Sequence, residues 1–261
     1  MKEKTLNSLI KLILFVAVLF GGYTVYNDYY NSDTVKIANW NLQIFGQSKL
    51  NNMKLMQTYS EVVQDYDIIF VQEIRDASQT AFPRLCSMLV NYSCMQSSRA
   101  GRTSSQEQYG IIYKKGINIT SFRDYNPDAQ DRWERPPIRT VFDINDYQLI
   151  VYNIHIKPED AQQELNYLEN LIVDSGNVLV LGDLNADCSY YNNEKQTEFD
   201  NWNWIIKDDE DTTSSNSNCA YDRIILNDGS YKEYVSDGIY TKEITPEISD
   251  HYLVWVEMNI N

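Results

Sequence analysis

The stretch VLVLGDLNADCSYY, residues 178–191, joins a short apolar run to a dense group of polar residues. Residues 178–181 have the length and composition of a strand that is buried on both faces. Asp183, Asn185 and Asp187 follow within five positions, and Cys188 comes next. Carboxylate and amide groups at the end of a buried strand are suited to bind a metal ion or a phosphate. This stretch therefore predicts both a covered sheet and a polar site at its edge.

Strand-like runs recur along the chain, and many end in a polar or charged residue. Helical patterns lie between them, with apolar residues at helical spacing in 55–63 and again in 161–172, after Pro158. Several strands look apolar on both faces, as in a sheet covered by another sheet on one side and by helices on the other. We therefore predict an α/β fold, a four-layer α/β/β/α sandwich with two packed mixed β-sheets flanked by helices. The strand-like runs are VKIANWN (35–41), DIIFVQE (67–73), YGIIYK (109–114), QLIVYNIHI (148–156), VLVLGD (178–183), DRIIL (222–226) and YLVWVEM (252–258).

The composition is that of one large globular domain, which we place at residues 31–261. The chain has 261 residues and a formal net charge of −15. This charge argues against a simple basic surface for nucleic acid. An acidic chain still binds a polyanion if divalent cations and a few local arginines neutralise the phosphates it touches, and its affinity then depends on metal as well as on salt.

Residues 1–30 differ from the rest of the chain. Lys2, Lys4 and Lys11 precede the apolar stretch LILFVAVLFGGYTVY (12–26). A basic start followed by a short apolar run predicts a signal peptide or an uncleaved signal-anchor, and a buried core helix is the alternative. No clear cleavage site is present, so removal of the segment stays open. Four cysteines agree with an extracytoplasmic, disulfide-permissive location, either secreted or membrane-anchored.

The chain has only two histidines, His155 in YNIHIKP and His251 in SDHYLV. A single histidine is more often structural than catalytic. Histidine titrates close to neutral pH, however, so a pair supplies one proton acceptor and one proton donor for cleavage of a phosphodiester.

Acidic and amide residues also lie at the ends of predicted strands, where caps and turns are common. If they gather on one rim they repel one another unless a cation lies among them, and hard oxygen ligands select Mg²⁺, Mn²⁺ or Ca²⁺ over zinc. These residues are Asn41, Glu73, Glu107, Asp183, Asn185, Asp222 and Asp250.

Eight segments resemble, in order, those of the deoxyribonuclease I family within the endonuclease/exonuclease/phosphatase superfamily. The match runs from about residue 35 to 259. The resemblance implies a divalent-metal-dependent endonuclease that hydrolyses phosphodiester bonds of double-stranded DNA with little sequence specificity. The segments are VKIANWNLQIFGQSKL, YDIIFVQEIRD, GRTSSQEQYG, RWERPP, YNIHIKPEDA, VLVLGDLNADCSYY, DTTSSNSNCAYDRIIL and ISDHYLVWVEM.

The resemblance also implies a role for each matched residue. Glu107 would orient His155 and Asp222 would orient His251, and these two pairs would act as general acid and base together with Asp183. Glu73 and Asp250 are implied to bind the catalytic Mg²⁺ or Mn²⁺. The residues implied to contact the metal or the scissile phosphate are Asn41, Asp183 and Asn185.

Two arginines match residues that contact DNA in the family. Arg75 corresponds to one inserted into the minor groove and Arg135 to one on a backbone phosphate, and an ordinary solvated face is the alternative for both. Ser105 replaces a tyrosine that packs on a sugar, which puts part of the groove contact in doubt.

The resemblance further pairs Cys188 with Cys219, which would close a loop of about 31 residues and contribute about 3–4 kcal/mol. Cys86 and Cys94 are candidates for a second, smaller disulfide. The segment DTTSSNSN resembles a structural Ca²⁺ loop, and a polar surface turn is an equally good interpretation. The implied calcium ligands are Asp211, Thr213 and Ser217.

Two other functions remain as alternatives. A phosphodiesterase or phosphatase acting on lipid or inositol phosphates, as in the sphingomyelinase branch, is compatible with NIHIKP and GDLN. A catalytically silent binding module would predict loss of the histidine–carboxylate pairs, and both pairs are intact. We expect DNA as the substrate, a monomer without an obligate protein partner, and membrane contact only through an N-terminal anchor.

Overall fold

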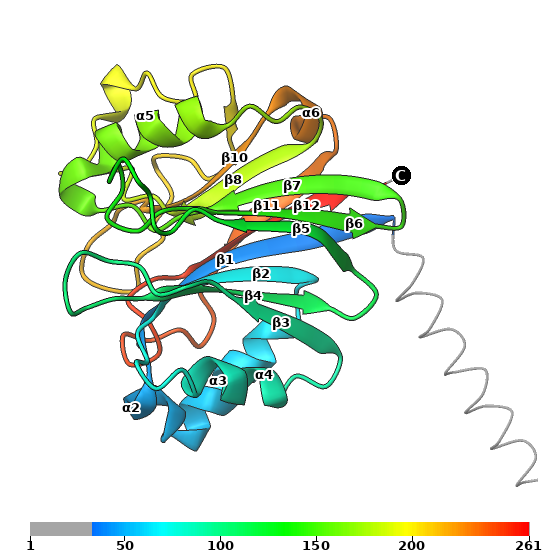
Figure 1. Ribbon diagram of the computed structural model, residues 1–261, viewed down its shortest axis with the longest axis vertical. Coiled ribbons are helices and arrows are strands. Elements are labelled where there is room, and N and C mark those ends of the chain that lie inside the picture. The colour runs from blue at the N-terminus through cyan, green and yellow to red at the C-terminus, as the bar shows by residue number, and fades with distance from the viewer. Residues whose placement is uncertain (1–32, 261) are drawn as a thin grey trace, which may run out of the picture. The chain divides into compact units, whose positions relative to one another are not determined.

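The structure, a computed structural model, describes residues 33–260. The predicted signal or anchor segment, residues 1–30, lies outside this range. Within it, none of the helices has the length and apolar character needed to cross a bilayer. Two six-stranded mixed sheets pack face to face with helices on their outer faces (Figure 1), as predicted for an α/β/β/α sandwich.

The first sheet is built around β1, which pairs with β2 in parallel and with β12 antiparallel. β4 then runs antiparallel to β2. In spatial order the strands are β11 (Tyr234–Tyr240), β12 (Leu253–Asn259), β1 (Thr34–Phe45), β2 (Ile68–Ile74), β4 (Gln108–Lys114) and β3 (Tyr92–Gln96).

The second sheet has the same mixed pattern. β7 and β8 are its parallel pair, and β10 runs antiparallel to β8. In spatial order the strands are β5 (Asn118–Asp124), β6 (Ile138–Ile144), β7 (Tyr147–Asn153), β8 (Val178–Asp183), β10 (Asp222–Leu226) and β9 (Asn203–Trp204).

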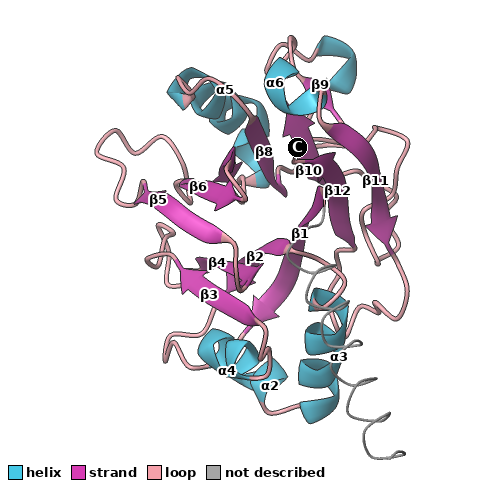
Figure 2. Ribbon diagram, turned by 90° about the vertical axis from the view of Figure 1, so that its right-hand side faces the viewer, coloured by secondary structure: helices cyan, strands magenta, loops and turns pink. Residues whose placement is uncertain are grey.

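Helices form the outer layers, as Figure 2 shows with α2, α3 and α4 on one side and α5 and α6 on the other. The predicted helical patterns correspond to α3 and to η1 followed by α5. The helices are α2 (Gln47–Leu50), α3 (Met53–Val63), α4 (Ala81–Ser87), η1 (Pro158–Asp160), α5 (Ala161–Leu171), η2 (Asn193–Lys195) and α6 (Asp228–Tyr231).

Three apolar cores hold these layers together. The central core lies between the sheets, where the rings of Phe70 and Phe142 meet edge to face at 6.0 Å between centroids. A second core packs α3 and α4 on the first sheet, and a third packs α5 on the second. Strands that touch two cores are buried on both faces, which explains why their sequences read as continuous apolar runs.

Strand direction gathers the polar ends at one rim of the sandwich. The carboxyl ends of β1, β2, β7 and β8 meet there, together with the amino ends of the antiparallel strands β4, β10 and β12. Side-chain contacts join the two sheets across this rim: Asn41 Nδ2 donates to Asp183 Oδ2 at 2.9 Å. Every strand end that carries a predicted site residue therefore faces the same region.

The predicted strand over 148–156 is too long, because β7 ends at Asn153 and His155 lies two residues beyond it. The chain stays close to β8 past this point, since Ile156 N–H donates to Asp183 O at 2.9 Å. Gly182 makes this approach possible: a Cβ on it would lie 1.8 Å from the Ile154 carbonyl oxygen. His155 is therefore fixed against β8 without being part of the ladder.

A turn that is held by the carboxylate of Asp76 follows β2 and leads into α4. Both oxygens of the buried Asp76 accept hydrogen bonds, which come from Ser78 and from the N–H groups of Thr80 and Ala81. Burial alone would raise the pKa of Asp76, but these hydrogen bonds outweigh it and hold that pKa well below its usual value. The turn fixes the segment that carries Arg75, the residue just before it.

Candidate active site

Two histidine–carboxylate pairs face each other at the rim. His155 Nδ1 lies 2.6 Å from Glu107 Oε1, and His251 Nδ1 lies 2.7 Å from Asp222 Oδ2. The Nε2 atoms of the two rings lie 3.3 and 3.6 Å from the same atom, Asp183 Oδ2. The two imidazoles thus point at one place from opposite sheets.

The same carboxylates control the charge of the two rings. Burial by itself would lower the pKa of His251, but Asp222 and Asp183 outweigh it and raise that pKa to about 10. Burial and Arg135 act to lower the pKa of His155, yet the nearby carboxylates raise it above its usual value. A cation bound among these carboxylates competes with the ring protons, because both are attracted by the same negative charge.

Glu73 lies beside the first pair, at the end of β2. Its Oε1 accepts a hydrogen bond from Asn41 Nδ2 at 3.4 Å, and its Oε2 accepts one from Ile44 N–H at 2.8 Å. Glu73 itself has a positive φ of 58°, which a non-glycine residue rarely adopts. Such a conformation persists only where the surroundings impose it, and here it turns the carboxylate toward the rim.

The donor set fits a hard divalent cation. Two groups of three ligand residues have their ligand atoms within 4.8 Å of one another, and carboxylates predominate in both. Oxygen-rich sets of this kind suit Mg²⁺, Mn²⁺ or Ca²⁺. The groups are Glu73, Glu107 and His155, and Asp183, Asp222 and His251.

Two predicted cation ligands lie at the margin of this arrangement. Asp250 Oδ1 is 3.8 Å from His251 Nε2, and the Asp250 side chain is 41% exposed. Asn185 is buried and donates through Nδ2 to the Ile156 carbonyl at 2.9 Å. Asp250 belongs to neither of the two groups of ligand atoms.

Both predicted DNA-binding arginines contact Glu107. Arg75 Nε lies 3.6 Å from Glu107 Oε2 and 3.2 Å from Glu73 Oε2. Arg135 Nε donates to the His155 carbonyl at 2.9 Å. One nitrogen of Arg135, Nη2, is buried without a hydrogen-bond partner, and so is Glu107 Oε2. Arg135 Nε also lies 3.4 Å from Glu107 Oε1, so its positive charge is held beside the first histidine pair.

Sequence reasoning did not identify the amides that support the pairs. Asn39 Oδ1 accepts hydrogen bonds from Gln72 and from Asn153, and Asn39 Nδ2 donates to Asp222 Oδ1 at 3.4 Å. All three amide residues are buried between the sheets. In the sequence, each of these residues is only an amide near the end of an apolar strand. The same pattern is found where a side chain caps the end of a strand or begins a turn.

Two disulfides are present, Cys86–Cys94 and Cys188–Cys219. The second joins the loop after β8 to the segment before β10, and so links the chain near Asp183 to the chain near Asp222.

The resemblance to a calcium loop concerns a segment close to the rim. Asp211 Oδ1 accepts hydrogen bonds from Thr213 N–H and Oγ1, and Ser217 Oγ donates to Thr213 Oγ1 at 3.0 Å. Thr213 also forms an isolated bridge with His251. These contacts bring the three predicted ligands into one compact turn next to the second histidine pair.

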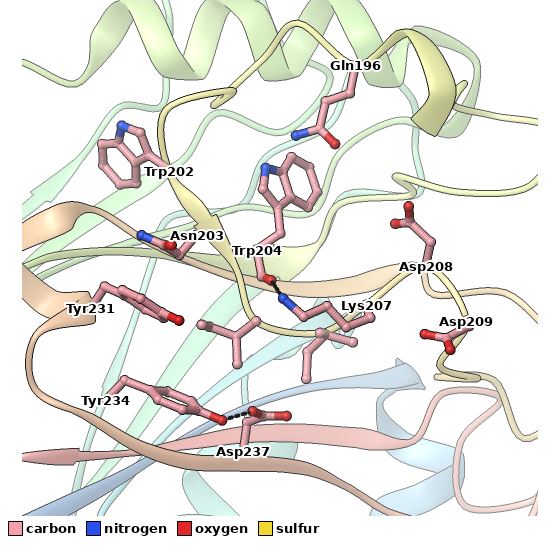
Figure 3. Close-up of a pocket in the computed structure, with 12 residues that line it drawn as sticks. Gln196, Trp202, Asn203, Trp204, Lys207, Asp208, Asp209, Tyr231, Tyr234 and Asp237 are labelled. Carbon is pink, nitrogen blue, oxygen red and sulfur yellow. Dashed lines mark hydrogen bonds between the residues drawn. The ribbon is translucent and has the colours of Figure 1, made fainter.

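A separate cleft of about 780 Å³ lies between the edge strands β9 and β11. In Figure 3, Trp202 and Trp204 lie across from Tyr231 and Tyr234. The cleft is at the far ends of β10 and β12 from the rim, because Trp204 pairs with Ile225 and Tyr234 with Met258.

Three of the four charged residues that line this cleft have partners within the protein. Asp208 pairs with Arg223 at 2.9 Å, Asp237 accepts from the Tyr234 hydroxyl, and Lys207 Nζ donates to the Trp204 carbonyl. No predicted site residue lines the cleft.

Comparison with known proteins agrees with this geometry. The sequence profile of the endonuclease/exonuclease/phosphatase family matches residues 38–251. The chain is 30% identical to deoxyribonuclease-1 of Gallus gallus, over 86% of this chain and 92% of that protein. It is 29% identical to deoxyribonuclease gamma of Homo sapiens, over 84% of each chain.

A solved structure shows the same fold at lower identity. The endonuclease/exonuclease/phosphatase from Bacteroides vulgatus superimposes with a TM-score of 0.66 and 17% identity, covering 88% of this chain and all of that one. The chain therefore belongs to the endonuclease/exonuclease/phosphatase family, and within it to the deoxyribonuclease I-like members.

Proposed function

We propose that this protein is a divalent-metal-dependent endonuclease that hydrolyses phosphodiester bonds of double-stranded DNA with little sequence specificity. The observation that carries the proposal is the convergence of both imidazole Nε2 atoms on Asp183 Oδ2. The relatives whose chains this one matches over most of their length are named deoxyribonucleases, which favours DNA as the substrate.

The histidines exchange protons at Nε2, because a carboxylate holds each Nδ1. Glu107 and Asp222 fix the orientation of the rings and stabilise their positive forms. One Nε2 takes a proton from the attacking water, and the other gives a proton to the leaving oxygen of the sugar. The short distances from both Nε2 atoms to Asp183 Oδ2 support the proposal that both transfers take place at a single phosphate.

Glu73 and Asp250 are the proposed carboxylate ligands of a catalytic Mg²⁺ or Mn²⁺, with Asn41 and Asn185 contacting the ion or the scissile phosphate. When bound, the cation stabilises the negative charge that develops on the phosphate oxygens. Asp183 lies between the two rings and belongs to the group that also contains Asp222 and His251. A structural Ca²⁺ in the Asp211 turn is a further part of the proposal.

Arg75 and Arg135 supply the local positive charge that the chain lacks as a whole. Arg75 is proposed to reach the minor groove. Arg135, with its unpaired Nη2, is proposed to contact a backbone phosphate. Binding to DNA should then depend on the divalent cation as well as on salt, because the net charge of the chain is −15.

We further propose that residues 31–261 form the catalytic domain of a monomeric extracytoplasmic enzyme, secreted or tethered by residues 1–30. The two disulfides support this location, because disulfides form and persist in oxidising compartments.

Nicking of supercoiled plasmid by the purified full-length protein tests the function. Wild type should nick the plasmid with Mg²⁺ or Mn²⁺, and EDTA should abolish nicking. H155A and H251A should each remove the activity, whereas the control E159Q, which changes an exposed carboxylate on η1, should retain it. Metal-dependent nicking that survives in both histidine variants would refute the proposal.

The alternative substrate class is tested in the same preparation. A phosphodiesterase of the lipid branch should release phosphocholine from sphingomyelin vesicles and leave the plasmid intact. Hydrolysis of the lipid without plasmid nicking would replace the deoxyribonuclease proposal.

A further inference from the structure

Lys49 on α2 is a buried lysine next to the proposed cation site. Only 9% of Lys49 is exposed. A lysine that is buried to this extent usually has a partner for its charge. Its ammonium donates to two backbone carbonyls, Leu42 O and Ile248 O, each at 2.7 Å. Leu42 and Ile248 are far apart in the sequence, so the side chain ties two distant segments together.

The first of these segments, residues 41–44, supports Glu73. Leu42 lies between Asn41, whose amide contacts Glu73, and two residues with positive φ, Gln43 at 44° and Ile44 at 52°. The turn made by these residues aims Ile44 N–H at Glu73 Oε2. The position of the Leu42 carbonyl is therefore coupled to the position of the proposed ligand.

The second segment leads into the other proposed ligand. Ile248 is followed by Ser249, Asp250 and His251. Ser249 Oγ donates to Asn41 O at 2.6 Å and accepts from His251 N–H at 3.1 Å. A shift of the Ile248 carbonyl would therefore move the residues that follow it.

No ladder hydrogen bonds are available to hold these two segments together. The register of β1 with β12 runs from Thr34 opposite Asn259 to Asn39 opposite Val254 and stops there. Beyond it the segments are joined through side chains: those of Trp40, Ser249 and Lys49. Among these three links, Lys49 is the one that carries a charge.

We propose that Lys49 is a positioning residue of the cation site: its ammonium joins the Leu42 and Ile248 carbonyls and so fixes the spacing between Glu73 and Asp250. This inference rests on the proposed metal-dependent function. Lys49 does not act as a ligand, and a positive charge near the carboxylates opposes cation binding by itself. The gain from fixing the ligands must therefore exceed this electrostatic cost.

Positioning of the ligands by Lys49 strengthens cation binding, whereas repulsion by its charge weakens it. A binding measurement therefore tests the proposal without measuring catalysis. Mn²⁺ binding to the purified full-length protein, without DNA, is followed by the electron paramagnetic resonance of the free ion. K49M should weaken Mn²⁺ binding by about tenfold or more, the usual effect of losing a residue that orients metal ligands. K49R, which keeps both the charge and the donors, should bind more like wild type, and K54M is the control for an exposed lysine on α3.

Three results would overturn the proposal. Tighter Mn²⁺ binding by K49M would show that Lys49 acts only as a repelling charge. Unchanged affinity with a lower Tm would show a role in folding alone. If K49M does not melt cooperatively, K49Q takes its place, and failure of both to fold would also assign Lys49 to folding.

Hydrogen exchange gives an independent measurement. The amides of Ile44 and His251 donate to Glu73 and Ser249, so both should exchange faster in K49M, while amides of α5 should not change. Lack of plasmid nicking by the wild type counts against the proposed function. Equal Mn²⁺ affinities of wild type and K49M count against the role of Lys49 alone.

Discussion

The two disulfides offer a matched pair of perturbations, because both cross-link the same domain but only one of them joins loops of the rim. Cys188–Cys219 spans 31 positions and connects the segments that carry Asp183 and Asp222. Cys86–Cys94 spans 8 positions and connects α4 to the edge strand β3. We predict that the double variants C188A/C219A and C86A/C94A differ in stability by a modest amount and in activity by a large one.

Loop-closure entropy sets the expected stabilities. A closed loop of 31 residues corresponds to about 3.7 kcal/mol at 25 °C, and one of 8 residues to about 2.5 kcal/mol. For a domain of this size, each kcal/mol shifts Tm by about 2–4 °C. C188A/C219A should therefore lower Tm by about 7–15 °C and C86A/C94A by about 5–10 °C.

Activity should separate the two variants much more clearly. The ladder pairs Asp183 directly with Asp222, so loss of the covalent link acts by loosening the loops beyond this pair, and a displacement of about 1 Å at the site can cost a factor of about 100 in rate. The rate of plasmid nicking should fall at least tenfold in C188A/C219A. In C86A/C94A it should fall less than threefold, which is far less than the effect expected when site residues are displaced.

Calorimetry gives Tm, and initial nicking rates are measured at a temperature where circular dichroism shows both variants to be folded. The reasoning is refuted if folded C188A/C219A nicks plasmid as fast as C86A/C94A. A larger loss of stability in C86A/C94A would refute the entropic argument separately.

Three other predictions concern single residues. E107Q and D222N should each lower kcat by about 100-fold or more with unchanged circular dichroism, because each removes the charge that holds an imidazole; a kcat within threefold of wild type would contradict the proposed pairs. D76N should lower Tm at neutral pH. The pKa of Asp76 is depressed in the folded state, so the stability that its carboxylate contributes is complete above the usual aspartate pKa of about 3.9 and is lost as the pH falls below that value. The Tm difference between wild type and D76N should therefore shrink in acid. A difference that is constant from about pH 7 to about pH 3 would refute this. R135M should weaken DNA binding and reduce the slope of log K against log salt by about one; an unchanged slope in fluorescence anisotropy would exclude a phosphate contact by Arg135.

The strands that sequence reasoning located best are those buried on both faces. VLVLGD and DRIIL coincide with β8 and β10, because strands between two apolar layers are continuous apolar runs. The edge strands β3, β5, β9 and β11 were not identified. The residues of β5 and β11 are mostly half-exposed or exposed, so neither has a clear apolar face in its sequence. β6 was also missed, although its apolar residues Ile138, Phe142 and Ile144 occupy alternate positions.

For the site, sequence reasoning named the histidines and carboxylates that the structure brings together, but not Asn39 or Lys49. His155, His251 and their carboxylates stand out because such residues are unusual beside apolar strands. Asn39 and Lys49 are ordinary in sequence, and their importance depends on contacts with residues more than 100 positions away, such as Asp222 and Ile248. Long-range contacts of this kind cannot be read from one sequence.

The central strand β1 has a practical consequence for handling the enzyme. It starts at Thr34, directly opposite Asn259, and reaches Asn41 about 23 Å further along at 3.3 Å per residue. Both Thr34 and Asn259 therefore lie at the end of the sandwich opposite the rim that carries the histidine pairs. A bead, surface or fusion partner joined near either residue would lie about 23 Å from Asn41 and so leave the rim unobstructed, which suits the protein to immobilised formats.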